Sequence, residues 1–409
     1  MSKKEKKKID NVALQEEIKL DIPEDEIWTY QIEGLAAPHI NKPYKHYNLK
    51  KFIFAVVIII AVSLSCYFSV RTVQKDTFEY ENTGSETYQL SKFSNTGYIK
   101  ELEIDFVSSV EYDSENPDVT SNFTIVKDKT KTVKEIREYA FNCDEKLQVV
   151  YIGADVIYVD SKAFYSCWAL QRIEVDENNP NYCDVDGVLY NKDKTEVICY
   201  PCDHDTYLAE KYGWAEYDES GNRIEPDASS ENYEQYKNDV LTYVIPSTVE
   251  TVGELCFNYA NMTTVYLPEG LKSIETLGFF EIPKLAEIYS YKADNVTDTH
   301  FTSAEALGEV YLSLPEGLEY IGSDAFSYNQ AMTYVYIPES VTHIGHHAFW
   351  DTVYKSDGNL CGVTQINVAA SEDAFSDVET GDDWRPKYDY LLFKKSVDIV
   401  YSAERQSIA

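Results

Sequence analysis

The chain has 409 residues and is strongly acidic, with 36 Lys and Arg residues, 70 Asp and Glu residues and a formal net charge of −34 at pH 7. Residues 1–51 hold ten of the basic and nine of the acidic side chains, so residues 52–409 carry a formal charge of −35. A field of this sign repels nucleic acid and anionic lipid surfaces. We therefore expect no nucleic-acid partner; the charge favours either simple solubility or attraction for basic partners.

Residues 1–51 are predicted to form a largely disordered tail, because charged residues dominate and few side chains are suited to a core. The segment EIWTYQI at residues 26–32 is its one apolar patch. Two interpretations stay open: a docking site for a cytoplasmic partner, or a few apolar residues in a solvated tail.

Residues 52–70, FIFAVVIIIAVSLSCYFSV, are 19 residues without a charged side chain. At 1.5 Å per residue, a helix of this length measures about 28 Å, which is enough to cross the hydrocarbon core of a membrane. Lysines precede the segment, whereas acidic residues dilute the basic ones that follow it. The positive-inside rule therefore predicts a cytoplasmic N-terminus. The polar residues 71–87 are expected to form an extracellular tether.

An internal repeat dominates the rest of the chain. The stretches VKEIREYAFNCDEKLQVVYI (133–152) and VIYVDSKAFYSCWALQRIEV (156–175) share one apolar pattern, and Phe141 and Phe164 are 23 residues apart. A period in the twenties is typical of a solenoid, whose units bury their apolar faces only by stacking on neighbours. The same position is taken further along by Phe257, Phe279, Phe301, Phe326, Phe349 and Phe375, with Phe93 in a degenerate first copy.

Each unit ends in a short alternating segment such as Val-x-Ile, which is typical of a strand with two inward side chains and one outward. We expect one parallel strand per unit and a right-handed sheet of about eight rungs. Residues 106–132 are predicted to be a polar insertion before the first regular unit.

The segments LPEGLEYIGSDAF (314–326) and IPESVTHIGHHAF (337–349) resemble the leucine-rich repeats of the bacterial surface antigen (BspA) type. The resemblance covers residues 88–402 and implies a repeat solenoid, mainly β with short helical and loop segments. It also implies an island hairpin at residues 176–201 and a shortened second one at 389–402. Residues 203–240 interrupt the repeats as an acidic insertion, in which TYLAEKYGW predicts a short helix and the remainder a loop.

The cysteines and histidines indicate no chemistry. Cys143 and Cys167 follow repeat phenylalanines, where the resemblance implies buried free thiols. Cys199 and Cys202 form a Cys-x-x-Cys pair, but it ends the island hairpin and lacks a thioredoxin-like context. The three histidines between residues 343 and 347 fall at variable positions of the repeat. We therefore expect no catalytic residues, no cofactor and no metal.

The outward strand positions supply the candidate binding residues. They are rich in tyrosine, and the candidates are Tyr151, Tyr266, Tyr289, Tyr311, Tyr334 and Tyr336. Equivalent side chains on neighbouring parallel strands lie about 4.8 Å apart, so Tyr266, Tyr289, Tyr311 and Tyr336 are expected to form a ladder. Two interpretations are equally open. The ladder either braces the sheet, or it offers a ligand wide contact area and hydroxyl groups.

Together these features favour a single-pass membrane protein of the cell surface that recognises or adheres to an extracellular protein or glycan. The alternative is a membrane scaffold or sensor subunit that acts through its cytoplasmic tail. An enzyme is not expected, because no hydrolase, phosphate-binding or metalloprotease motif occurs.

Overall fold

The computed structural model describes residues 77–95, 99–112, 123–299, 307–350, 362–385, 387–390, 393–397 and 399–408. All of the described residues belong to one compact unit. The predicted tail (1–51), its apolar patch (26–32) and the predicted transmembrane helix (52–70) lie outside the described residues. Within the described ranges, no helix has both the length and the apolar character that a membrane span needs.

The described chain begins with a mixed sheet that covers the first repeat. Its strands are β1 (Thr77–Gly84), β2 (Thr87–Ser94), β4 (Phe106–Tyr112) and β5 (Phe123–Ile136), with the two-residue β7 (Tyr158–Val159) beside the end of β5. The predicted tether at 71–87 is therefore wrong from Thr77 onward, and strands replace the described part of the predicted insertion at 106–132. Alternate side chains such as Phe78, Val110 and Ile125 pack against the first core, which explains why these polar-looking segments are strands.

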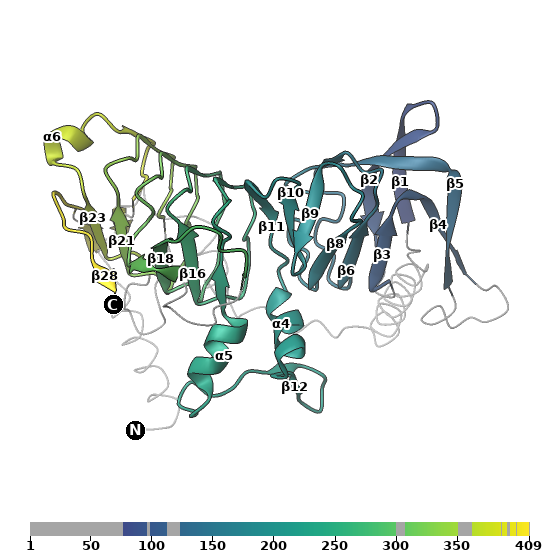
Figure 1. Ribbon diagram of the computed structural model, residues 1–409, viewed down its shortest axis with the longest axis horizontal. Helices are drawn as coiled ribbons and strands as arrows, with labels where there is room; N and C mark the ends of the chain where they lie inside the picture. The colour runs from purple at the N-terminus through teal and green to yellow at the C-terminus, as the bar shows by residue number, and fades with distance from the viewer. Residues whose placement is uncertain are drawn as a thin grey trace, which may run out of the picture. The chain divides into compact units, whose positions relative to one another are not determined.

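Three groups of parallel strands form the rungs that the repeat predicts. They are β3 (Glu101–Ile104), β6 (Val149–Ile152) and β8 (Arg172–Val175); β14 (Thr242–Val244), β16 (Thr264–Pro268) and β18 (Glu287–Lys292); and β21 (Tyr334–Ile337), β23 (Gln365–Val368) and β27 (Ile399–Val400). Figure 1 shows the groups following one another in chain order. The parallel register confirms the solenoid, whereas the prediction of one continuous sheet of eight rungs is wrong.

A second ladder of short parallel strands runs along the repeats and was not predicted. It consists of β11 (Glu196–Cys199), β15 (Thr251–Val252), β17 (Ser273–Ile274), β20 (Tyr320–Ile321), β22 (His343–Ile344) and β24 (Glu379–Thr380). A glycine follows several of these strands and lies against the backbone of the preceding unit. A Cβ at Gly345 would overlap the backbone of Gly322 and Ser323, so close stacking of the units requires glycine there.

Phenylalanine rings stack through the interior and show which units are neighbours. The rings of Phe141 and Phe164 lie 5.2 Å apart at an angle of 8°. In the later units, neighbouring centroids are 4.7–5.3 Å apart in the series Phe257, Phe279, Phe326 and Phe349. All of these rings are buried, which confirms the predicted role of the repeat phenylalanine.

The unit predicted around Phe301 is wrong, because Phe326 follows Phe279 directly in the stack. β17 likewise pairs directly with β20, and β19 (Glu309–Tyr311) runs antiparallel to β18. Residues 293–299 and 307–313 therefore lie outside the repeat, and we call them the excursion; Phe301 itself lies outside the described residues. The apolar spacing of β19 imitates a rung because an alternating pattern carries no information about strand direction.

The last unit also departs from the prediction. Phe375 ends the short helix α6 (Glu372–Phe375) and is not a stacked repeat residue. Instead, the N–H of Phe349 donates to the carbonyl of Trp384 at 2.9 Å, the bond that repeat phenylalanines make to the next unit. β25 (Lys387–Tyr390) and β26 (Phe393–Ser396) form the antiparallel hairpin expected near residues 389–402, and β28 (Ser407–Ile408) returns to pair with β19.

The island hairpin is confirmed and separates two hydrophobic cores. It consists of β9 (Tyr182–Val185), β10 (Val188–Asn191) and β11, which pair antiparallel. Val188 and Tyr190 enter the core of the later units, whereas Leu189 between them enters that of the earlier units. Tyr200 takes the place of a repeat phenylalanine, because its ring lies 5.2 Å from that of Phe257. The island hairpin therefore also takes the place of one repeat unit in the stack.

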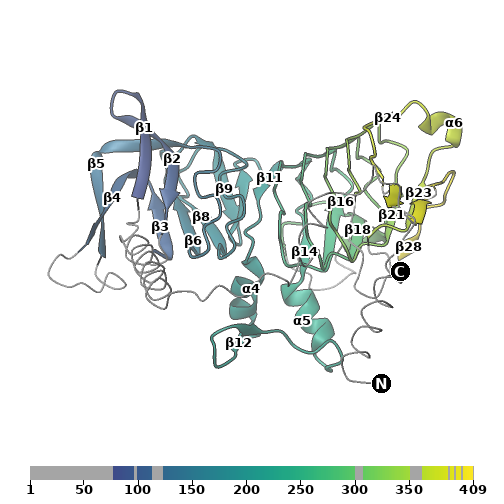
Figure 2. The ribbon, with the colours of Figure 1, turned by 180° about the vertical axis from the view of Figure 1, so that it is seen from behind.

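Residues 203–240 form a small folded insertion rather than a loop. It contains α4 (His204–Tyr212), the hairpin of β12 (Glu216–Tyr217) and β13 (Arg223–Ile224), and α5 (Tyr233–Val240). The predicted short helix is confirmed as α4, but the predicted loop is wrong, because Leu208, Tyr236 and Val240 build a core of their own. Figures 1 and 2 show α4 and α5 side by side, projecting from the same side of the repeats.

Candidate functional site

Tyr151 occupies the outward position that the repeat predicts. It lies between Glu103 and Glu174 on the neighbouring strands β3 and β8. Around it is a hollow of about 420 Å³, to which Glu101 and Asp176 contribute further carboxylates. The Tyr151 side chain is half-buried, so part of its ring is accessible to a ligand.

Tyr266 and Tyr289 stack as predicted, with ring centroids 5.1 Å apart on the paired strands β16 and β18. Both rings pack against a small core that includes Tyr291, together with Leu307 and Val310 from the excursion. Burial raises the pKa of Tyr289 to about 12. Because the excursion covers part of both rings, packing of this pair stabilises the sheet, and only part of each ring is exposed to solvent.

The predicted ladder ends at this pair, so a ladder of four tyrosines is wrong. Tyr311 lies on the antiparallel β19, and the guanidinium of Arg405 stands 3.7 Å from its ring centroid. Tyr336 is only 3% exposed and donates a hydrogen bond to the carbonyl of Ala403 at 3.3 Å. Tyr334 is half-buried. Residues 402–408 therefore cover this part of the sheet face.

A different set of exposed or half-buried aromatic side chains lies along the turns beside the stacked phenylalanines. Tyr139 and Trp168 are 44% and 46% exposed, and the others are half-buried. Successive ring centroids are 4.3–6.1 Å apart. We call this set the aromatic row; it consists of Tyr139, Tyr165, Trp168, Tyr259, Phe280 and Tyr328. The aromatic row was not predicted, because the repeat pattern requires no particular residue type at these turn positions.

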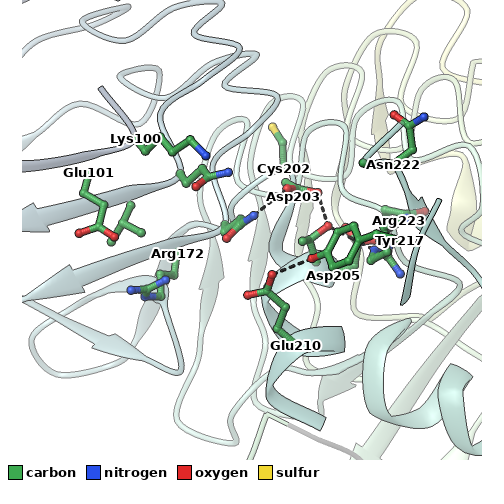
Figure 3. A pocket seen from close by; sticks show the side chains of 16 residues that line it. Lys100, Glu101, Arg172, Cys202, Asp203, Asp205, Glu210, Tyr217, Asn222 and Arg223 are labelled. Atoms are coloured by element: carbon green, nitrogen blue, oxygen red, sulfur yellow. Dashed lines mark hydrogen bonds and ion pairs between the residues drawn. The ribbon is translucent and has the colours of Figure 1, made fainter. Parts of the chain in front are cut away.

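A polar cavity of about 710 Å³ lies between the first rungs and the insertion. Figure 3 shows Lys100, Glu101 and Arg172 on one wall and Glu210 and Tyr217 on the other. The first wall comes from the starts of β3 and β8, and the second from α4 and the β12–β13 hairpin. We refer to this site as the polar cavity. It was not predicted, because residues 203–240 looked like an unstructured acidic loop.

Hydrogen bonds hold the two walls of the polar cavity together. The side-chain amide of Gln171 donates to Asp203 at 3.2 Å, and the N–H of Asp203 donates to the carbonyl of Leu170 at 2.8 Å. On the insertion side, the hydroxyl of Tyr217 donates to Glu210 at 2.7 Å. Burial raises the pKa of Asp203 to about 6.

A buried ion pair anchors the hairpin that forms the far wall. The guanidinium of Arg223 contacts the carboxylate of Asp205, whose residue is only 3% exposed, and donates to the hydroxyl of Tyr236 at 2.8 Å. Asn261 donates a second hydrogen bond to Asp205 at 2.6 Å. A buried ion pair with hydrogen-bonding partners of this kind holds its side chains in one geometry, because separating the two charges inside the protein costs free energy.

Three of the described cysteines, Cys167, Cys199 and Cys202, are buried thiols suited to packing. Cys167 is buried, as expected, and its thiol lies 3.0 Å from the carbonyl of Phe141, whereas Cys143 is exposed, contrary to the prediction. Cys199 and Cys202 are buried free thiols, and burial raises the pKa of Cys202 to about 12. Little thiolate then exists near neutral pH, so this pair is a poor nucleophile. Within the described ranges, no three His, Cys, Asp or Glu side chains are grouped to hold a metal.

The parallel rungs, the second short ladder and the stacked phenylalanines define a leucine-rich repeat solenoid. Six copies of the family model for the BspA type leucine rich repeat region match residues 77–184 and 230–354, and the chain belongs to this family. Leucine-rich repeat proteins are generally binding proteins and not enzymes. A search of curated protein sequences found no match.

Several solved structures match this chain at low sequence identity. A leucine-rich repeat protein from Eubacterium ventriosum is 14% identical, with 76% of this chain and 83% of that chain covered and a TM-score of 0.35. The pneumococcal vaccine antigen PcpA is also 14% identical, with 76% and 97% covered and a TM-score of 0.35. A leucine rich cell surface protein from Faecalibacterium prausnitzii is 16% identical, with 81% and 95% covered and a TM-score of 0.26.

Proposed function

We propose that this protein is a cell-surface recognition protein that binds an extracellular macromolecule through the aromatic row. The supporting observation is the row itself, a set of neighbouring rings that reaches across turns of both the earlier and the later units. Exposed Tyr and Trp residues are the side chains that most often dominate binding energy at protein interfaces. They offer a large contact area and lose little conformational entropy on binding.

The predicted sheet-face tyrosines remain a second candidate surface for the same function. Of these, Tyr151 lies in an acidic hollow that suits a basic ligand group. The aromatic row is the stronger candidate, because the excursion and residues 402–408 cover much of the later sheet face.

Binding is tested by probing an array of extracellular proteins and glycans with the full chain, and then comparing two double variants against each ligand found. Replacing Trp168 and Tyr259 with Ser should weaken binding more than about tenfold, because truncation of an aromatic hot spot at an interface costs about 2 kcal/mol or more. The matched control replaces Tyr266 and Tyr289 with Ser. It should keep the affinity and lower the melting temperature, since these rings are packed.

The opposite pattern would place the ligand on the sheet face and refute the aromatic row. If both double variants bind every ligand like the wild type, recognition through exposed aromatic surfaces is wrong.

A further inference from the structure

The polar cavity is a built feature of this chain and not a by-product of the repeat. Its far wall comes mainly from residues 203–240, which interrupt the repeat. The insertion is fixed there by the buried Arg223–Asp205 pair and by the bond from Gln171 to Asp203. Groups held by such contacts keep their places before a ligand arrives, which lowers the entropy cost of binding.

The lining of the cavity is suited to hydroxyl groups. The side-chain amide of Asn222 donates one N–H to Asp218 at 3.1 Å and offers its second N–H and its oxygen, and carboxylates such as Glu101 and Glu210 offer acceptors. The ring of Tyr217 also lines the cavity, and the apolar face of a sugar ring can pack against it. Pockets for drug-like apolar molecules are lined mainly by hydrophobic side chains, whereas most of the described lining residues of this cavity are polar or charged.

The charges of the cavity disfavour an anionic ligand. Lys100, Arg172 and Arg223 are the cations among the described lining residues. Arg172 is paired with Glu174 at 2.7 Å and Arg223 with Asp205. Lys100 is outnumbered by the lining carboxylates, which are Glu101, Asp203, Asp205 and Glu210. Carboxylates such as Glu101 remain along the walls, and residues 52–409 as a whole carry a charge of −35. A phosphate or an acidic sugar would meet repulsion from both sources.

We infer that the polar cavity binds a neutral oligosaccharide, with Tyr217 packing against a sugar ring and Glu101 and Asn222 hydrogen-bonding its hydroxyl groups from opposite walls. The cavity is formed by different residues from the aromatic row, so this site is independent of the proposed recognition surface. The protein would then hold two separate ligands, a saccharide in the cavity and a macromolecule on the turns.

The inference is tested by isothermal titration calorimetry, in which the purified full chain is titrated with three neutral tetrasaccharides, namely cellotetraose, maltotetraose and chitotetraose. Sialyllactose is the anionic probe and spermine the cationic one. We expect saturable binding of at least one neutral tetrasaccharide. Tyr217→Ala and Glu101→Gln should each weaken it about tenfold or more, because each removes a ligand contact from one wall and leaves hydroxyl groups unpaired.

The matched control is Tyr212→Ala, which removes an exposed tyrosine at the end of α4, outside the cavity lining. It should leave the saccharide affinity unchanged, and so should the double replacement of Trp168 and Tyr259 with Ser. Glu101 is exposed, so its replacement tests the site without disturbing the insertion. The inference is overturned if no neutral tetrasaccharide binds, if binding survives both cavity variants, or if only sialyllactose or spermine binds. Failure of saccharide binding with intact array ligands would leave the aromatic row standing.

Discussion

At the scale of the residue, one ring per unit defines the interior. Phe279 is fully buried, and its ring lies between those of Phe257 and Phe326 at centroid distances of 4.7 and 5.2 Å. The next residue, Phe280, carries the same side chain but is half-buried in the aromatic row. Two adjacent phenylalanines therefore have different roles, and the pair provides an internal comparison.

We predict that Phe279→Ala lowers the free energy of unfolding by about 3–5 kcal/mol, because it removes buried surface and leaves a cavity in a stacked core. Phe280→Ala, the control, should cost clearly less. Chemical denaturation followed by circular dichroism measures both values. Equal losses for the two variants would show that the assigned stack of rings is incorrect.

At the scale of the element, the insertion depends on a single buried cation. Arg223 is the hydrogen-bonding partner of both Asp205 on α4 and Tyr236 on α5, so it connects the hairpin to both helices. The neighbouring pair of Lys284 and Glu225, at 2.7 Å, joins the same region to the repeats but is much more exposed. Buried and exposed ion pairs differ greatly in the cost of losing one partner.

We predict that Arg223→Met loosens the insertion, because the carboxylate of Asp205 is then buried without its cation, at a cost of about 3–5 kcal/mol. Amide hydrogen exchange should rise across residues 203–240 and stay low in the core strands β16 and β17. Lys284→Met, the control, should change exchange little, since exposed pairs contribute about 0–1 kcal/mol. Unchanged exchange in the insertion of the Arg223 variant would contradict this account.

At the scale of the whole molecule, the repeats contain two hydrophobic cores separated by the island hairpin. Neighbouring side chains of β10 alternate between them, with Leu189 on one side and Val188 and Tyr190 on the other. In a solenoid, stability is close to a sum of contacts between neighbouring units, so damage in one core should remain local. The proposed location of these repeats outside the cell depends on residues 52–70, which lie outside the described residues.

We predict that protease added to intact cells digests the repeats and spares a tag at the N-terminus, because the lysines before residues 52–70 favour a cytoplasmic start. Permeabilised cells provide the control, in which the tag should be digested as well. Immunoblotting with antibodies to the tag and to the repeats measures the result. Protection of the repeats in intact cells would refute an extracellular function.

The amino-acid pattern is sufficient to predict the solenoid and the buried phenylalanines, and the resemblance to BspA-type repeats implies the island hairpin. These features repeat at a near-constant spacing or lie next to one another in the chain, and each unit can bury its ring only by stacking on the next. The register of Tyr151 with Glu103 and Glu174, and of Tyr266 with Tyr289, follows from the same spacing.

Only the tertiary structure shows which predicted positions are open to a ligand. Arg405 covers Tyr311 and donates to Ser313, 92 residues earlier in the chain, and no local pattern contains such a contact. The sequence also does not show that β19 runs antiparallel to β18, because alternating apolar residues fit parallel and antiparallel neighbours alike. The polar cavity depends on a salt bridge between the insertion's own hairpin and helix. The repeat pattern shows only what the units have in common. The covered part of the sheet face and the polar cavity are formed by segments that do not belong to the repeat.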